Sequence, residues 1–264
     1  MKNSILFSIA VIALGYIGLL IDHLTSAATP GTPGMLLWIL APMIASFVLR
    51  FVDGEGWSDL GWQPGFERNG RTLLISVVFY PVVILPVLAL GRITGLAACP
   101  PELPTPGLVL HAFGVLLIPQ IVQNVFEESG FRGYLSPKLL KTDLHPLVAH
   151  LLTGLVWGLW HLPYLKFIVP YKSEPMISFA PRFIVGTMAA SIVFGELRRR
   201  SNSVWPAIFA QTVGGATIGA ILAVGVRFPA LPQIFSPTIE GGLVILLTTA
   251  VGLWLWKRGE HRTV

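Results

Sequence analysis

Eight long apolar stretches run through this 264-residue sequence and limit the folds it can adopt. A helix needs about 20 mostly apolar residues to cross the hydrocarbon core of a bilayer. Because backbone groups in that core must be satisfied internally, such stretches favour helices. We therefore expect an all-α, polytopic membrane bundle of about eight transmembrane helices. The predicted spans are residues 4–21, 34–52, 72–91, 108–128, 146–163, 181–197, 204–226 and 238–256.

The composition supports a membrane protein and argues against other classes. Hydrophobic residues make up 53% of the chain and charged residues only 12%, whereas soluble domains are about one-quarter charged. The net charge of +5 is explained by basic residues gathered on one side of a membrane, so nucleic-acid binding is not expected. A single cysteine, Cys99, excludes an intrachain disulfide and a cysteine-based metal cluster. The expected partner is the lipid bilayer.

The spacing of the spans indicates a single domain. The sequence shows no fixed-period repeat and no low-complexity tract. Its longest interruptions, residues 53–71, 92–107 and 164–180, are too short to hold a second domain. We therefore expect one membrane-embedded domain over residues 1–264, with any functional site built into the bundle or its loops.

The first apolar stretch has two interpretations. Lys2 precedes the apolar run, and the small residues Ser26, Ala27 and Ala28 follow it, as they would at a signal-peptide cleavage site. The run is long for a signal peptide, and the rest of the chain is polytopic in either case. Residues 1–26 are therefore either a retained helix or a cleaved signal.

The distribution of basic residues predicts the orientation. Eight spans put both termini and loops 53–71, 129–145 and 198–203 on one side of the bilayer. That side carries 13 lysines and arginines, and the other side carries five. Because basic residues accumulate on the cytoplasmic side, we expect both termini in the cytoplasm. The expected location is a bacterial cell membrane.

A polar stripe follows the fourth predicted span. Five side chains fall within an arc of about 140° on a helix that turns about 100° per residue. They are Gln120, Gln123, Asn124, Glu127 and Glu128. Because such a stripe is costly against lipid, we expect it to face the bundle interior or a watered cavity. Alternatively, the glutamates merely end the span at the membrane surface. The negative end of a helix disfavours carboxylates, so we expect the helix to continue beyond them.

Glu127 and Glu128 have different expected surroundings. Arg132 lies one turn beyond Glu128, at the i,i+4 spacing of a helical ion pair. This pair would hold Glu128 charged and oriented. Glu127 would then be freer for proton chemistry.

His161, near the end of the fifth span, is expected to meet Glu127. A lone histidine in an apolar helix is usually structural. However, Glu127 and His161 both lie 17 residues from Leu144, so antiparallel helices turning there would bring them to one depth. This requires Pro137 to kink the fourth helix without ending it. His150 lies about 16 Å from His161 along the helix axis and is not expected to share a ligand with it.

Two motifs in these spans resemble those of a known family. Glu127-Glu128-x-x-x-Arg132 is followed by Trp157-x-x-x-His161 on the next span. This arrangement closely resembles the CPBP family, also called the Abi or CAAX-protease-like family of intramembrane endopeptidases, which carries EExxxR and then FxxxH on successive membrane helices. Trp157 stands where the family commonly has phenylalanine. The resemblance covers residues 110–220, and the flanking helices match only in being hydrophobic.

The chain departs from the third motif of that family. The motif is a histidine followed four residues later by asparagine or aspartate, on a helix opened by a small-aromatic-proline phrase. Residues 203–208 supply the phrase. Gln211 then stands where the resemblance asks for histidine, and Gly215 where it asks for asparagine or aspartate.

The resemblance implies a role for each matching residue. Glu127 would be the general base that activates water, Glu128 and Arg132 a supporting pair, and His161 a water holder or metal ligand. Gln211 would be at most a substitute that positions water or polarises a carbonyl.

The third motif also bears on zinc and on catalytic rate. The resemblance implies zinc, but zinc sites favour histidine, cysteine and carboxylate ligands, and His161 is the one plausible strong nitrogen ligand. A conventional zinc site is therefore not expected. Losing one oxyanion donor costs about 100- to 1000-fold in turnover, and Gly215 removes such a donor.

Three functional classes remain open. The first is an intramembrane endopeptidase acting on prenylated or membrane-bound proteins, or on peptides such as bacteriocins. The second is a catalytically weak or inactive scaffold or immunity protein, which Gln211 and Gly215 favour. The third is a transporter in which the glutamates relay protons or bind cations. Transporters often show two matching halves, which this sequence lacks.

Overall fold

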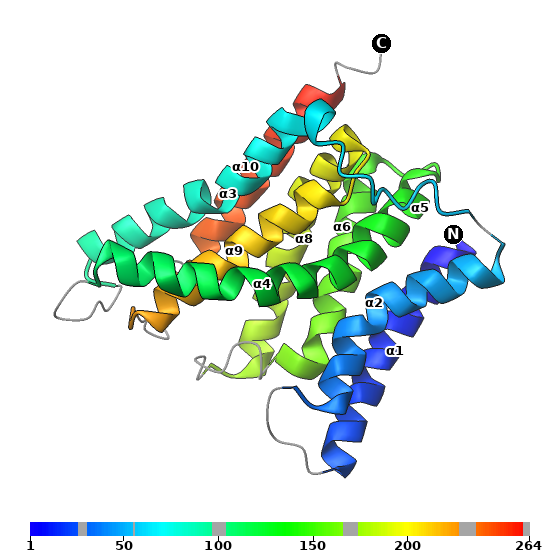
Figure 1. Ribbon diagram of the computed structural model, residues 1–264, viewed down its shortest axis with the longest axis horizontal. Coiled ribbons are helices and arrows are strands. Elements are labelled where there is room, and N and C mark those ends of the chain that lie inside the picture. Colours follow the sequence, from blue (N-terminus) through cyan, green and yellow to red (C-terminus); the bar gives the residue numbers. More distant parts are fainter. Residues whose placement is uncertain (26–30, 55, 97–103, 166–173, 227–235, 261–264) are drawn as a thin grey trace.

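A computed structural model describes residues 1–25, 31–54, 56–96, 104–165, 174–226 and 236–260. Every regular element among these residues is helical, which confirms the predicted all-α class (Figure 1). Cys99 and the candidate cleavage site at Ser26–Ala28 lie outside the described residues. The division of the chain into one domain stays a prediction.

Each of the eight predicted spans contains a long helix. These helices are α1 (Lys2–Leu24), α2 (Pro33–Val52), α3 (Phe66–Ile93), α4 (Pro106–Gly130), α6 (Pro146–His161), α8 (Met176–Ser201), α9 (Trp205–Ala223) and α10 (Gly242–Glu260). A π-helix, η1 (Phe131–Leu135), and a short α5 (Ser136–Leu140) continue α4. A 3₁₀ turn, η2 (Leu162–Tyr164), continues α6.

Six helical stretches among the described residues are long and apolar enough to cross a membrane. One of them is the continuous rod Pro106–Leu140, which has 35 residues. By contrast, α6 has 16 residues, fewer than the roughly 20 that a full crossing needs. The chain is thus a polytopic helical membrane protein, and α6 spans only part of the bilayer thickness by its own length.

Local sequence signals set where several helices begin. The Thr32 side chain caps α2 and the Thr105 side chain caps α4, each by accepting a backbone N–H three residues later. Each cap is followed directly by a proline, which is well suited to the first helical position because it lacks an N–H. Pro146 begins α6 in the same way.

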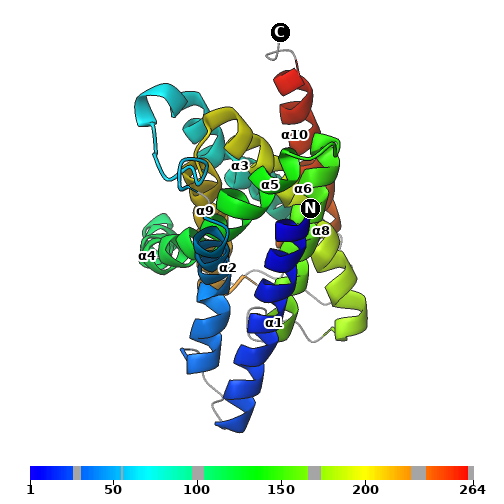
Figure 2. The same ribbon diagram turned by 90° about the vertical axis from the view of Figure 1, so that its right-hand side faces the viewer.

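Small residues determine which helices pack together. A Cβ atom on Gly34 of α2 would overlap the carbonyl oxygen of Gly18 in α1, and these helices lie side by side (Figure 2). A Cβ on Gly154 of α6 would lie 2.5 Å from the Met188 Cα atom in α8. In lipid, where helix association depends on close van der Waals contact, such glycines select the neighbours.

An aromatic core lies where α1, α2, η1 and α6 meet. The rings of Trp38 and Trp160 stack with centroids 4.6 Å apart, and Phe131 contacts Trp160 at 5.7 Å. The Trp38 indole N–H also donates to the Trp160 carbonyl oxygen at 2.9 Å, so the ring is both packed and hydrogen-bonded. This core supports the part of the molecule that holds the two glutamates.

Segments predicted to share one side of the membrane meet at one end of the bundle. Asn3 donates to Asp53 at 2.8 Å, and Lys141 donates to Asp59 at 2.8 Å. His145 contacts the ring of Trp256, near the end of α10, with centroids 5.5 Å apart. These contacts agree with the predicted grouping of loops. The cytoplasmic location of this end and the bacterial origin stay predictions.

Candidate functional site

The helix that carries the glutamates continues beyond them, as expected, and passes Pro137 before ending at Leu140. Proline has no N–H to give to the carbonyls four and five residues before it. In this protein those carbonyls belong to Gly133 and Arg132. Arg50 donates to the Gly133 oxygen at 2.8 Å, and Arg198 donates to the Arg132 oxygen at 3.1 Å. Two arginines from α2 and α8 thus satisfy the carbonyls that the proline leaves without partners.

Three arginines in and around this helix were among the 13 basic residues that predicted which side of the bundle faces the cytoplasm. Arg50, Arg132 and Arg198 are only 1%, 0% and 5% exposed, respectively. Their side chains hold the rod and its neighbours together instead of meeting the membrane surface. The basic excess on that side is therefore smaller in exposed charge than the sequence count implies.

Glu128 and Arg132 form the predicted i,i+4 ion pair. The Arg132 Nη1 atom lies 2.8 Å from Glu128 Oε1, and both side chains are fully buried. The Arg132 guanidinium also lies 4.9 Å from the ring centroids of Trp157 and Phe194. Such cation–π contacts are favourable for a desolvated guanidinium. Arg132 is thus fixed on Glu128 by charge and by packing.

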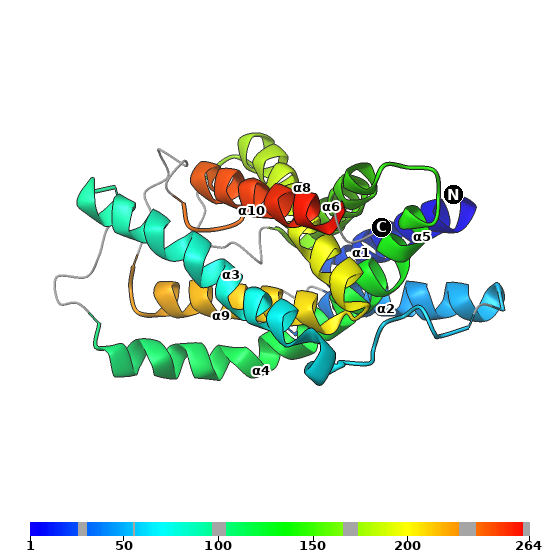
Figure 3. The same cartoon turned by 90° about the horizontal axis from the view of Figure 1, so that it is seen from above.

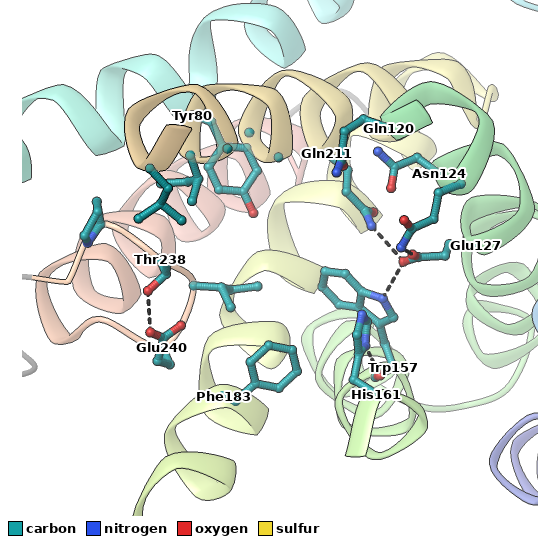
Figure 4. A pocket seen from close by; sticks show the side chains of 18 of the residues that line it. Tyr80, Gln120, Asn124, Glu127, Trp157, His161, Phe183, Gln211, Thr238 and Glu240 are labelled. Carbon is teal, nitrogen blue, oxygen red and sulfur yellow. Dashed lines mark hydrogen bonds between the residues drawn. The ribbon is translucent and has the colours of Figure 1, made fainter. Parts of the chain in front are cut away.

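Glu127 lies at a junction of three helices. It is fully buried and accepts a hydrogen bond from Gln123 of α4 at 2.8 Å. It also accepts from Trp157 of α6 at 3.0 Å and from Gln211 of α9 at 2.7 Å (Figure 4). All three donors are neutral groups. The structure therefore brings Gln211 directly to Glu127, although the two residues are 84 positions apart in the sequence.

His161 faces the same cavity as Glu127. Its Nδ1 atom lies 2.8 Å from the Trp157 carbonyl oxygen. Because a carbonyl can only accept, Nδ1 carries the hydrogen, and Nε2 of the neutral ring is left as an acceptor. The ring also makes an edge contact with Phe183, with centroids 5.3 Å apart. The imidazole is thus held in one orientation by a backbone bond and aromatic packing.

Glu127 and His161 meet by a different route from the expected antiparallel hairpin. The α4 helix lies along α9, and α6 lies along α8, so α4 and α6 cross instead of pairing along their lengths (Figures 1 and 3). Glycines explain the choice of neighbours. Gly215 and Gly219 of α9 face α4, whereas Gly154 and Gly158 of α6 face α8. The hairpin prediction is therefore wrong, although both residues line one cavity.

The cavity has a volume of about 390 Å³ and is lined by residues from six of the long helices and from the segment 237–240. A polar group gathers at one side and includes four of the five residues of the predicted stripe (Figure 4), whereas Glu128 is not among the lining residues. Its members are Gln120, Gln123, Asn124, Glu127 and Gln211. Glu240 and Thr238 lie across the cavity from them. Tyr80 and Phe183 contribute to the wall between these groups. The cavity wall therefore presents both polar and apolar surfaces.

Sequence reasoning missed the role of Trp157 beside Glu127. The motif comparison treats tryptophan as a mild replacement for phenylalanine. The indole N–H, however, donates to the Glu127 carboxylate, which a phenylalanine ring could not do. A buried tryptophan usually needs a hydrogen-bond acceptor, so its position one turn before His161 was a usable signal. Glu240 was also missed, and it lies outside every motif.

The residues around Glu127 do not fit a zinc site. Catalytic zinc sites are held by three protein ligands, drawn mainly from histidine, cysteine and carboxylate side chains. Around this cavity His161 supplies one nitrogen, while Gln211 directs an N–H at Glu127. Among the described residues, no group of three or more histidine, cysteine, aspartate or glutamate side chains could hold a metal ion. The chemistry that these residues support is therefore that of water and the side chains.

Comparison with known proteins agrees with the motifs. No curated protein shows significant similarity to the chain. Residues 108–217, however, match the family described as type II CAAX prenyl endopeptidase Rce1-like. The matched segment contains Glu127, His161, Gln211 and Gly215. Together with the motifs and the helical fold, this match over residues 108–217 supports an assignment to the CPBP family of CAAX-protease-like proteins.

Proposed function

We propose that this protein is an intramembrane endopeptidase that hydrolyses peptide bonds of membrane-associated proteins or peptides, with Glu127 activating the water. The main support is the setting of Glu127, a buried carboxylate with neutral donors, in a cavity that it shares with His161. The family assignment supports a CAAX-protease-like endopeptidase at a coarser level. Prenylated C-terminal segments and transmembrane peptides are the substrate classes to test.

In the proposed reaction, Glu127 takes a proton from water as the water oxygen attacks the peptide carbonyl carbon. The bare Nε2 of His161 accepts the other hydrogen of the water and orients it. Gln211 has a second N–H besides the one bonded to Glu127, and this N–H donates to the developing oxyanion. When the carbon–nitrogen bond breaks, Glu127 returns its proton to the leaving amine. The products are a carboxylic acid and an amine.

The Glu128–Arg132 pair has a supporting role in this proposal. Arg132 is bonded to Glu128 at 2.8 Å, so its charge does not directly pair with Glu127. Glu127 can then gain and lose a proton during the cycle without breaking an ion pair of its own. The pair also braces the π-helical segment directly after the general base.

The second candidate is a catalytically weak or inactive scaffold or immunity protein. Gln211 favours it because a neutral amide replaces an imidazole and commits one N–H to Glu127. Gly215 favours it because that position supplies no side-chain donor. Both candidates predict peptide binding in the cavity, and they differ in whether a bond is broken.

The decisive experiment compares the wild type with Glu127→Gln after reconstitution into liposomes. Farnesylated C-terminal peptides and transmembrane peptides are added, and products are identified by mass spectrometry. We expect cleavage by the wild type and a loss of about 100-fold or more in the variant, because a general base is removed. Glu67→Gln, in the exposed first turn of α3, is the matched control and should cleave normally. Equal cleavage by wild type and Glu127→Gln would overturn the mechanism. Saturable binding without cleavage would favour the scaffold.

Metal analysis tests the zinc argument separately. We expect less than one tightly held zinc ion per purified chain, because the ligand set is incomplete. Elemental analysis of the detergent-purified protein measures this directly. Stoichiometric zinc that disappears in His161→Ala would contradict the expectation.

A further inference from the structure

Gly215 leaves a space in α9 that Gln120 of α4 fills. A Cβ atom built on Gly215 would overlap the Gln120 Oε1 atom and lie 2.7 Å from its Cδ atom. The side-chain amide of Gln120 thus occupies the volume where a residue at 215 would place its own side chain. The amide comes from the opposite helix.

The register of α4 against α9 explains this exchange. Glu127 contacts Gln211, and Asn124 donates to Thr212 at 3.0 Å. Farther along, Gln120 faces Gly215 and Leu116 faces Gly219. Because residue numbers fall along α4 as they rise along α9, the helices are antiparallel (Figure 3). Gln120 is therefore held opposite Gly215 by a continuous helix contact.

The Gln120 amide is available to a ligand. Gln120 lines the same cavity as Glu127 and Gln211 and lies on the same side of it (Figure 4). Within the described part of the chain, its amide makes no hydrogen bond to another residue. The Gln211 Oε1 atom is also buried without a partner among the described residues. An amide carries two donors and an acceptor, the set that pairs with a peptide backbone.

We propose that Gln120 is a substrate-binding residue that hydrogen-bonds the main chain of an extended peptide, a role that rests on the endopeptidase function proposed above. Gln120 lies seven residues before Glu127, which is about 10 Å along the helix axis. An extended peptide advances about 3.3 Å per residue. Gln120 therefore contacts the substrate about three residues from the bond that Glu127 attacks.

The first test measures kcat and KM for the panel peptide that the wild type cleaves fastest. Gln120→Ala should raise KM about 3- to 10-fold, the value of one hydrogen bond, and leave kcat within about twofold. Gln120→Glu keeps the shape of the side chain but removes both hydrogen-bond donors, so its KM for the peptide should be at least as high as that of Gln120→Ala. Gln63→Ala, at an exposed loop position, is the control and should match the wild type. A fall in kcat with unchanged KM would overturn the binding role.

The second test removes the side-chain amide from position 120 of α4 and places one at position 215 of α9. Gly215→Asn alone should lower the thermal unfolding midpoint, because its side chain meets Gln120. Combining Gly215→Asn with Gln120→Ala should restore the midpoint and bring KM to within about threefold of wild type. A double variant that folds normally but keeps the KM of Gln120→Ala would contradict the proposal.

These outcomes separate the two proposals. If the wild type cleaves no peptide, the endopeptidase function fails, and the role of Gln120 fails with it. If the wild type cleaves and both Gln120 variants keep its KM, the assignment of Gln120 alone is wrong.

Discussion

Glu127 and Glu196 are both fully buried and both lie near a histidine, but their surroundings differ in charge. Glu127 accepts hydrogen bonds from three neutral groups and lines the cavity with His161. Glu196 of α8 lies 3.2 Å from His150 Nε2 and 2.8 Å from Arg199 Nη2. Glu196 is not among the residues that line the cavity. Burial beside a histidine is therefore common to a structural cluster and a candidate site. Neutral donors and adjacent space distinguish the site.

The sequence around each glutamate produces this difference. Glu196 precedes the run Arg198–Arg200 at the end of α8, so cationic partners lie within one turn of it. Glu127 follows amides at the i−3 and i−4 positions, and its one nearby arginine pairs with Glu128. Glu196 therefore braces the end of α8 through its ion pairs, whereas Glu127 is bonded to neutral donors and is the carboxylate proposed above as the general base.

The largest expected effects come from neutralising each glutamate separately. Glu127→Gln should reduce peptide cleavage by about 100-fold or more. It should shift the thermal midpoint little, because the glutamine oxygen can still accept from Trp157 and Gln211 while its NH2 group donates to Gln123 with the amide of Gln123 turned over. Glu196→Gln should destabilise the fold by about 3 kcal/mol, since it removes one partner of a buried ion cluster. The remaining folded protein should cleave at the normal rate. Initial rates and thermal unfolding in one detergent measure both properties. The comparison would be wrong if Glu127→Gln mainly lowered the thermal midpoint and Glu196→Gln mainly lowered the cleavage rate.

Sequence reasoning reached the helices and the polar stripe because both depend on local periodicity. The continuation past Glu128 and the Glu128–Arg132 pair also followed from spacing along one helix. The motif resemblance, not spacing, brought Gln211 into the same hypothesis as Glu127. In each case a short segment or a known pattern carried the needed information.

Contacts between helices that are distant in the sequence could not be predicted from local spacing or from the motifs. The pairing of α4 with α9 depends on Gly215 and Gly219 facing α4, which no single-helix pattern reveals. The bonds from Arg50 and Arg198 to carbonyls near Pro137 join two separate helices, α2 and α8, to the rod. Such contacts depend on the crossing geometry of the bundle, so counting charges along the sequence placed these arginines at the membrane surface.

Trp157 allows an intermediate test of what neutral donors contribute to Glu127. Trp157→Phe introduces the residue common in the CPBP family and removes the 3.0 Å indole hydrogen bond. We expect kcat to fall about 10-fold, because a hydrogen bond to a charged group is worth about 1.5–3 kcal/mol when its geometry matters. Trp254→Phe, at a 43% exposed position in α10, is the control. Unchanged kcat in Trp157→Phe would show that Gln123 and Gln211 suffice to position Glu127.

A third carboxylate, Asp59, extends the comparison to the loop between α2 and α3, where the expected effect is smallest. Burial raises the pKa of Asp59, but hydrogen bonds and charges from Lys141 and Arg50 outweigh it, so the pKa falls below its usual value of 3.8. A carboxyl group whose pKa is lowered by folding stabilises the fold at pH values above its unfolded-state pKa. This stabilisation is lost as the pH falls through its folded-state pKa. Asp59→Asn should therefore cost about 1 kcal/mol at pH 7. Its difference from wild type should shrink in thermal scans below about pH 4. Asp143→Asn, in the exposed loop before α6, is the control. A difference independent of pH would mean that Asp59 acts through its shape and hydrogen bonds, not through the cationic pairing that also distinguishes Glu196 from Glu127.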